Sequence, residues 1–217
     1  MKNKETRREG AGARLEGAEA VLLPIRFGPF EALDKIRQAK PYRPAALDGK
    51  IRSSRTRVEA RLLARAKEAG VPCPPVLGVG PHDIVMGKVG GKTLNKMEGR
   101  KIGASVWKLA GRYLARLHKA NIVHGDFTPA NLMLDEKNKK TGRGGGAASL
   151  LVIDFGLGSV SADTEDHAVD VLTMKKALKE KKAQAAFLDG YKSEGHARVL
   201  ALMEEVEKRA RYQDRGG

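Results

Sequence analysis

Two short stretches decide how this sequence is interpreted: residues 124–131 read HGDFTPAN, and residues 154–156 read DFG. An amphipathic pattern over residues 105–120 predicts a helix before the first stretch. Two strands of a hairpin are predicted by the apolar residues 132–134 and 150–153. Each stretch alone could be a turn or a chance match. Their combination with a preceding helix and an intervening hairpin predicts a single functional site.

The residue types in these stretches suit phosphoryl transfer from Mg-ATP. Asp126 can orient or deprotonate an attacking hydroxyl, and Asn131, five positions later, has the spacing of the metal-binding amide in protein-kinase catalytic loops. Asp154 opens DFG and is the expected Mg²⁺ ligand, because carboxylate and amide oxygens suit this hard cation. We therefore expect a kinase-like fold, with Asp126 as the catalytic residue and with Asn131 and Asp154 as metal ligands.

An enzyme of this kind also needs a lysine for the phosphates and a glutamate that holds the lysine. Helical spacing predicts a helix over residues 57–69, with Glu59 near its start. An acid that stabilises the first helical turn is the alternative role of Glu59. Lys35 is the preferred lysine, although Asp34 precedes it where an apolar residue is expected. A solvated surface lysine is the alternative for Lys35, and Lys40 is the second choice.

The start of the chain and the segment after DFG depart from ordinary protein kinases. No GxGxxG motif occurs near the start, so the backbone around Gly17 and Ala18 is the candidate cover for the phosphates, with a plain tight turn as the alternative. Gly125 stands where an arginine receives the activating phosphate in many kinases, and no APE motif follows residues 154–156. We expect little room for docking a peptide and no activation by phosphorylation of the usual kind.

Charge and cysteine content limit the possible environments. The chain of 217 residues has 41 Lys and Arg against 26 Asp and Glu, a formal net charge of +15. This charge, with a basic loop predicted over residues 40–55, favours contact with nucleic acid, and solubility is the alternative. The one cysteine, Cys73, is expected to be an unreactive buried thiol. Neither a signal peptide nor a membrane span is predicted, and we expect a cytoplasmic protein.

The front of the chain is rich in predicted strands, and the back is mostly helical. This is an α+β arrangement with segregated halves. Residues 137–149 are rich in Gly and Lys and predict a flexible hairpin tip. The expected divisions are a flexible basic arm, a strand-rich N-lobe, a helical C-lobe and a basic C-terminal tail, at residues 1–14, 15–88, 89–207 and 208–217.

Beyond the catalytic stretches, the sequence resembles the small PRPK-type kinases of the KEOPS (EKC) complex in their stand-alone archaeal form. Two stretches are specific to that family: GAEA at residues 17–20 and EDHAVD at residues 165–170. Residues 35–43 also fit the family pattern K-x-R-x-x-K-x-Y-R. The likeness covers most of the chain, from about residue 17 to residue 209.

The resemblance implies a truncated bilobal kinase fold that uses ATP and Mg²⁺. It implies an atypical serine/threonine kinase and ATPase that supports threonylcarbamoyl modification of adenosine 37 in tRNA. The implied partners are the threonylcarbamoyl-transferring subunit, a small subunit that binds the N-lobe, and tRNA. The resemblance also puts Gly17 and Ala18 at the phosphates and Met86 at the hinge. Gly87 follows where a glutamate is usual, so adenine is expected to contact backbone groups there.

Three alternatives remain open at the level of the sequence. The first is a phosphotransferase for small molecules of the aminoglycoside or choline type, which usually has a second histidine where this chain has Thr128. The second is a RIO-type kinase of ribosome maturation, for which a longer N-terminal domain is expected. The third is a scaffold that keeps the fold without turnover. Retention of Asp126, Asn131 and Asp154 argues against the third.

Overall fold

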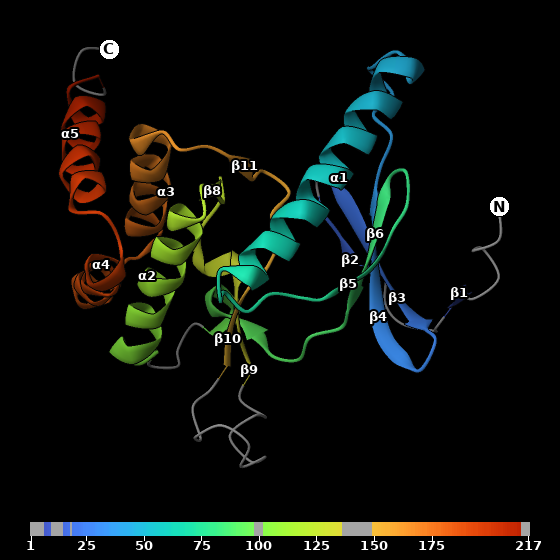
Figure 1. Ribbon diagram of the computed structural model, residues 1–217, viewed down its shortest axis with the longest axis horizontal. Coiled ribbons are helices and arrows are strands. Elements are labelled where there is room, and N and C mark those ends of the chain that lie inside the picture. The colour runs from blue at the N-terminus through green and yellow to red at the C-terminus, as the bar shows by residue number, and fades with distance from the viewer. Residues whose placement is uncertain (1–6, 10–14, 18, 98–101, 136–148, 214–217) are drawn as a thin grey trace. The chain divides into compact units, whose positions relative to one another are not determined.

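The protein is described by a computed structural model (Figure 1). The described residues are 7–9, 15–17, 19–97, 102–135 and 149–213. The chain divides into two compact units. The first unit comprises residues 1–64 and 74–89, and the second comprises residues 65–73 and 90–217.

The first unit is built on an antiparallel sheet of six strands. Its strands are β1 (Arg7–Glu9), β2 (Leu15–Glu16), β3 (Ala20–Phe27), β4 (Phe30–Arg37), β5 (Val76–Val79) and β6 (Asp83–Gly87). The order is β1-β3-β4-β6-β5, and β2 also pairs with β3. One face carries a small core of Ile25, Ala32 and Val85. Lys35 lies on the central strand β4, opposite Leu22 of β3 and Ile84 of β6.

Helix α1 (Ala45–Glu68) belongs to the first unit up to residue 64 and is longer than the sequence pattern predicted. The prediction began the helix at residue 57 and treated residues 40–55 as a loop, which is wrong for residues 45–55. Apolar residues mark only the later turns, where Leu62, Leu63 and Ala66 are buried. The first turns are polar, and an ion pair inside the unit, between Arg52 and Asp48, takes the place of apolar burial there.

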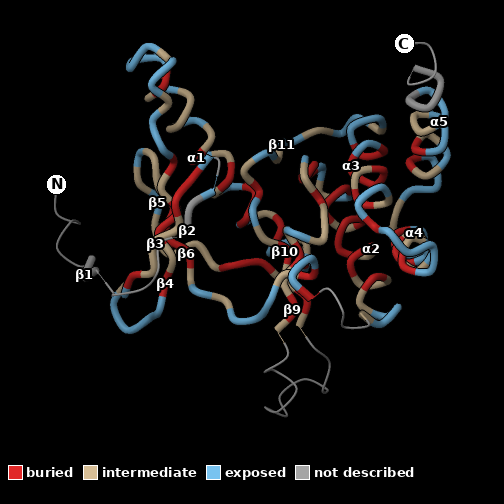
Figure 2. The backbone as a smooth tube through the Cα atoms, turned by 180° about the vertical axis from the view of Figure 1, so that it is seen from behind, coloured by how far each residue is buried: buried red, intermediate tan, exposed pale blue. Residues whose placement is uncertain are grey.

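The second unit is mostly helical, with two small sheets. Its helices are α2 (Ala104–Lys119), α3 (Thr164–Ala177), α4 (Lys181–Glu194) and α5 (Ala197–Gln213), with the 3₁₀ turns η1 (Leu94–Met97) and η2 (Pro129–Asn131). Its strands are β7 (Lys92–Thr93), β8 (Ile122–Val123), β9 (Leu132–Asp135), β10 (Ser149–Val152) and β11 (Ser159–Val160). The sheets are β10-β9-β7 and β11-β8. Figure 2 shows buried residues running through α2 and α3.

Helices α2 and α4 approach closely because glycines lie between them. A side chain at Gly111 would collide with the backbone of Phe187 and Tyr191, and one at Gly190 would collide with the backbone of Lys108. Close-packed interiors do not absorb such an insertion without moving a helix. The predicted helix over residues 105–120 therefore forms the centre of the second unit, one residue out of register with its prediction.

Several predictions fall partly outside the described residues. Within the predicted basic arm, β1 pairs with β3, so that part is not loose. The predicted hairpin tip falls almost wholly outside the described residues, but β9 and β10 on either side pair as predicted. Helix α5 extends through the first part of the predicted tail. Cys73 is buried, and burial raises the pKa of its thiol to about 11. Among the described helices, none is long and apolar enough to cross a membrane.

Candidate active site

The side chains of Asp126 and Asn131 are hydrogen-bonded to each other. The Asn131 amide nitrogen Nδ2 donates to the carboxylate oxygen Oδ2 of Asp126 at 2.7 Å and to its backbone oxygen at 2.8 Å. Both residues are half-buried. With Nδ2 engaged twice, the carbonyl oxygen of the Asn131 amide is the atom left to act as a metal ligand. The sequence prediction paired these two residues by spacing, and the structure brings them into contact.

Asp154 follows β10, and the residue before it, Ile153, bonds to the loop that carries Asp126 and Asn131. The N–H of Ile153 donates to the backbone oxygen of Asn131 at 2.9 Å. Asp154 has a left-handed backbone (φ 61°), and its carboxylate accepts a hydrogen bond from the N–H of Gly156 at 3.0 Å. A positive φ is uncommon for residues other than glycine, and aspartate adopts it more often than most of them. Asp154 is exposed, so its carboxylate is accessible to a metal ion.

His124 connects the loop to the strand end that precedes Asp154. Its Nε2 lies 3.3 Å from the backbone oxygen of Ile153, and its Nδ1 lies 3.3 Å from the backbone nitrogen of Asp126. A neutral ring with the proton on Nε2 satisfies both contacts, because it donates to Ile153 and accepts from Asp126. Burial lowers the pKa of His124, although the charge of Asp170 opposes this shift. The imidazole is therefore neutral at pH 7 and positions the backbone of Asp126.

Asp170 of α3 fixes the start of the loop. Its buried carboxylate accepts hydrogen bonds from the N–H of His124 at 2.6 Å and of Gly125 at 2.9 Å. Gly125 has a left-handed backbone (φ 77°), and a side chain there would collide with the carbonyl group of Leu157. Glycine at this position is thus explained by backbone geometry, since only Gly takes this conformation freely. A long side chain such as arginine would not fit in this arrangement.

In the first unit, Lys35 and Glu59 form a buried ion pair. Lys35 Nζ lies 2.6 Å from Oε1 of Glu59, and the side chain of Glu59 is 1% exposed. Arg37 bonds to the other carboxylate oxygen, so one glutamate serves two cations. An isolated buried charge would be costly, and this mutual pairing is what makes the burial possible. The backbone N–H of Lys40 donates to Asp48. The structure thus pairs the lysine that the sequence analysis preferred.

The structure says less about the other predicted nucleotide contacts, Gly17, Ala18 and Met86. The N–H of Gly17 donates to the carbonyl of Ala20 at 3.0 Å, which is a tight turn, and Ala18 lies outside the described residues. Met86 is buried in β6. The N–H of Gly87 already donates to Pro75 at 2.8 Å. A side chain at Gly87 would collide with Pro75, so a glutamate does not fit there.

The donor set in the second unit suits Mg²⁺ that is shared with phosphate groups. Magnesium is usually held by one or two carboxylates together with substrate oxygens rather than by a full protein cage. Among the described residues, no group of three or more His, Cys, Asp or Glu could hold a metal by itself. Asp154 supplies an exposed carboxylate, and Asn131 supplies an amide oxygen. The residues present fit the ion that the sequence predicted.

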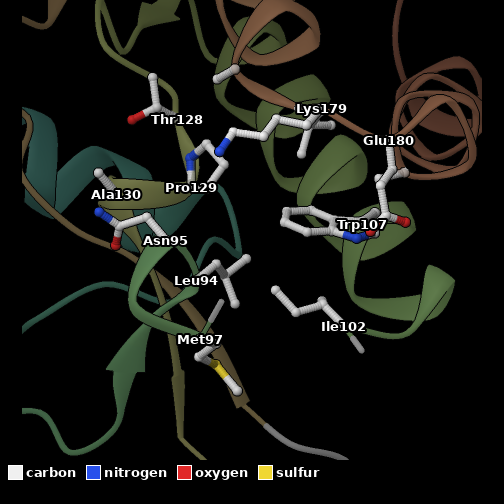
Figure 3. Close-up of a pocket in the computed structure, with 13 residues that line it drawn as sticks. Leu94, Asn95, Met97, Ile102, Trp107, Thr128, Pro129, Ala130, Lys179 and Glu180 are labelled. Atoms are coloured by element: carbon white, nitrogen blue, oxygen red, sulfur yellow. The ribbon is translucent and has the colours of Figure 1, made fainter. Parts of the chain in front are cut away.

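An apolar pocket of about 460 Å³ adjoins the loop at Thr128, Pro129 and Ala130 (Figure 3). Leu94, Met97, Ile102 and Trp107 form much of its wall, and Lys179 and Glu180 add charge at the junction of α3 and α4. A recess of this composition beside a catalytic loop suits an apolar side chain with a polar neighbour. No sequence pattern indicated it, because its walls come from segments far apart in the chain.

Two residues gain a role in the structure that no pattern assigned. Asp170 bonds to the backbone of His124 and Gly125, which lie 46 and 45 positions earlier in the chain. Its only signal was that it belongs to the EDHAVD stretch. Arg37 shares Glu59 with Lys35 across 22 positions, and its position in K-x-R-x-x-K-x-Y-R was the corresponding signal. Both contacts depend on tertiary structure and not on local spacing.

Comparisons with known proteins point to one family. The RIO domain family model matches residues 34–141. A protein of Archaeoglobus fulgidus, named probable serine/threonine-protein kinase BUD32 homolog, is 34% identical over 187 residues, which cover 83% of this chain and 88% of that protein. These matches confirm the resemblance found in the sequence.

A longer relative and a solved structure extend the comparison. A Methanocaldococcus jannaschii protein, named probable bifunctional tRNA threonylcarbamoyladenosine biosynthesis protein, is 35% identical over 207 residues, or 91% of this chain. The chain spans 36% of that relative's length. The Rio2 kinase of Chaetomium thermophilum, solved as an ADP/Mg²⁺-phosphoaspartate complex, has a TM-score of 0.65 at 17% identity and covers 94% of this chain and 71% of its own. This likeness confirms the α+β kinase-like fold.

Proposed function

The chain belongs to the BUD32-homologue family of RIO-domain proteins, and on this basis we propose that it is an Mg-ATP-dependent atypical serine/threonine kinase and ATPase. We propose further that it acts in the KEOPS complex and supports threonylcarbamoyl modification of adenosine 37 in tRNA. The names of its relatives support this role. The observation that carries the enzymatic part is the double hydrogen bond from the Asn131 amide to Asp126.

Each residue of the site has a chemical task in this proposal. Asp126 orients the attacking oxygen of a hydroxyl or of water and accepts its proton. Asp154 and the amide oxygen of Asn131 hold Mg²⁺, which neutralises charge on the phosphates when it is bound. Lys35 binds phosphate oxygens, and Glu59 keeps its ammonium group in place. Gly17, Ala18 and Met86 are the proposed backbone and apolar contacts of ATP.

The same site favours water as the acceptor over a free peptide. Positioning supplies much of phosphoryl-transfer catalysis, and a peptide needs a surface that holds it. Seven residues separate Gly156 from the start of α3 at Thr164, which leaves little chain for such a surface. Water needs none. We expect slow ATP hydrolysis by the isolated protein, some autophosphorylation, and faster hydrolysis once partners complete the site.

The proposed partners are the threonylcarbamoyl-transferring subunit, a small subunit that binds the first unit, and tRNA. The bifunctional relative supports the transferring subunit as a partner. This chain spans 36% of that relative, and the rest of the relative belongs to the same polypeptide. The net charge of +15 supports contact with tRNA. The proposed division of labour follows the predicted lobes, with the N-lobe at residues 15–88 and the C-lobe at residues 89–207.

The test compares water, a peptide and an aminoglycoside as phosphate acceptors with one enzyme preparation. ATP hydrolysis is measured for the protein alone and with the transferring subunit and tRNA, for wild type and for Asp126→Ala. We expect stimulation in wild type and none in the variant, with the assembly intact on gel filtration. Generic peptides and an aminoglycoside serve as competing acceptors. Efficient phosphorylation of the peptide would indicate an ordinary kinase, and efficient phosphorylation of the aminoglycoside would indicate a small-molecule phosphotransferase.

A further inference from the structure

A pocket of about 240 Å³ in the first unit is lined mainly by cations. We call it the basic pocket, and it is separate from the Lys35–Glu59 pair. Its cationic lining residues are Arg37, Lys40, Arg43, Arg52 and Arg55, and its other lining residues are Glu19, Gln38, Tyr42 and Ile51. Five cationic side chains therefore surround this space, and its one lining carboxylate, Glu19, pairs with Arg55 at 2.9 Å. Such a concentration of one sign of charge attracts anions.

The basic pocket is held in shape by a buried carboxylate. Asp48 is 2% exposed and accepts a hydrogen bond from Arg52 Nε at 2.6 Å and from the backbone N–H of Lys40 at 3.2 Å. Burial raises the pKa of Asp48, but these hydrogen bonds and the charges of Arg52 and Arg43 outweigh it and lower the pKa. Asp48 is therefore ionised at neutral pH and forms ion pairs with Arg52 and Arg43, which hold these two side chains in place. The cations are positioned by the fold rather than left as free surface charges.

Arg37 is the deepest member of the pocket. Its side chain is 5% exposed, and it bonds to Glu59 and lies 3.7 Å from Glu19. Its Nε is buried and has no hydrogen-bond acceptor among the described residues. The side chain of Arg37 lines the pocket, so an anion bound there would lie beside this guanidinium group.

An exposed aromatic ring lies at the same pocket. Tyr42 is 73% exposed, and the guanidinium carbon of Arg43 lies 5.2 Å from its ring centre. A large exposed aromatic side chain beside an arginine is typical of surfaces on which nucleobases stack. A free anion would be attracted by the cationic side chains but would have no base to stack on the ring of Tyr42. The two features together favour a nucleotide unit of RNA as the ligand.

We propose that the basic pocket binds a backbone phosphate of RNA with the adjoining base on Tyr42, and that Arg37 couples its occupancy to Lys35. Glu59 divides its carboxylate between Lys35 and Arg37. A phosphate that takes up part of the Arg37 charge leaves Glu59 more strongly paired with Lys35. RNA then raises the affinity for ATP, because Glu59 holds the Lys35 ammonium group more firmly in place for the phosphates. This coupling rests on the proposed function, whereas the RNA site does not.

The first experiment tests the site by binding alone. A short fluorescein-labelled single-stranded RNA is titrated without nucleotide, and its anisotropy is read at several salt concentrations. We expect Arg55→Ala to weaken binding about fivefold and to reduce the salt slope by about one. Tyr42→Ala should weaken binding about tenfold, while Tyr42→Phe retains it. Arg61→Ala is the matched control, because Arg61 is exposed on the same helix and does not line the pocket.

Equal losses for Arg61→Ala and Arg55→Ala would overturn the site in favour of general charge attraction. Wild-type binding by Tyr42→Ala, with displacement of the RNA by pyrophosphate, would assign the pocket to a free anion and overturn the RNA ligand. Circular dichroism checks that each variant is folded. Arg52 is left unchanged, because its loss would leave the buried Asp48 charge without its closest partner.

The second experiment tests the coupling by reciprocity. Saturating RNA should raise the affinity for a non-hydrolysable ATP analogue with Mg²⁺, and the saturating analogue should raise RNA affinity by the same factor. The expected factor is at least about fivefold in wild type and about one in Arg37→Gln. An analogue that binds without changing RNA affinity would overturn the coupling alone. An analogue that does not bind would overturn the proposed function and leave the first experiment unaffected.

Discussion

The carboxylate of Asp170 accepts a hydrogen bond from the backbone N–H of His124 at 2.6 Å, so a residue of α3 holds the loop that carries Asp126. The same carboxylate lies 3.3 Å from Nε2 of His118 in α2. Asp170 therefore joins two helices and the loop at one buried point. This relationship makes the geometry of the loop depend on the packing of the second unit.

Replacing Asp170 should damage both turnover and stability. In Asp170→Asn, one oxygen becomes an amide that faces an N–H donor, and a buried donor without an acceptor costs about 1–3 kcal/mol. We expect this loss in the free energy of unfolding, measured with urea, and at least a tenfold loss of ATP hydrolysis. Asp166→Asn in the same helix is the control, because Asp166 is exposed. Turnover at the wild-type rate in Asp170→Asn would show that the loop does not need this anchor.

The buried Lys35–Glu59 pair should matter for both nucleotide use and folding. Lys35→Ala should lower ATP turnover on the order of 10²-fold, as for other lost electrostatic contacts to a reacting group. Glu59→Gln leaves Lys35 and Arg37 without their shared carboxylate and should cost about 3–5 kcal/mol of unfolding free energy. Lys50→Ala, on the exposed side of α1, provides the comparison. Equal effects of Lys35→Ala and Lys50→Ala would remove Lys35 from the site.

Two buried histidines should make stability fall as the pH drops below about 6.5. Burial lowers the pKa of His118 and of His124 in the folded protein, against opposing contributions from Asp170. The unfolded chain then binds protons that the folded chain does not. Stability is complete above pH 6.5 and decreases below it by up to about 1.4 kcal/mol per pH unit for each histidine.

Urea unfolding at several pH values between 7.5 and 5 measures this slope before most carboxylates titrate. A constant unfolding free energy across this range would mean that the folded protein takes up protons at His118 and His124 as readily as the unfolded chain does. The lowered pKa of these two histidines would then be wrong.

The helix contact between α2 and α4 can be tested with matched glycine variants. Gly111→Ala puts a methyl group against the backbone of α4 and should cost at least about 1–3 kcal/mol, since the helices must move apart. Gly49→Ala is the counterpart in α1, where nothing lies within 4 Å of the added group. That change should stabilise the protein by about 0.5–1 kcal/mol. Thermal unfolding that ranks the two variants the other way would contradict the packing.

The sequence predicted local features well and tertiary contacts poorly. The helix over residues 105–120 was visible because its apolar side chains repeat at helical spacing. The candidate catalytic residues were visible because their spacing matches that of protein-kinase catalytic loops. The first turns of α1 were missed because Asp48 and Arg52 stabilise them through an ion pair, which hydrophobic periodicity does not report. The anchoring by Asp170 depends on packing between distant segments, so the EDHAVD stretch marked the residue but not its contact with the loop.

The metal role of Asp154 is the central claim, and magnesium-dependent ATP hydrolysis tests it most directly. Hydrolysis is measured against Mg²⁺ concentration for wild type and for Asp154→Ala, with circular dichroism as the check on folding. The side chain is exposed, so the protein should stay folded, with a small loss of stability because alanine disfavours the left-handed backbone at this position. We predict that Asp154→Ala loses at least about 10²-fold in rate at every Mg²⁺ concentration. An unchanged magnesium dependence and rate in a folded Asp154→Ala protein would contradict the assignment of this site.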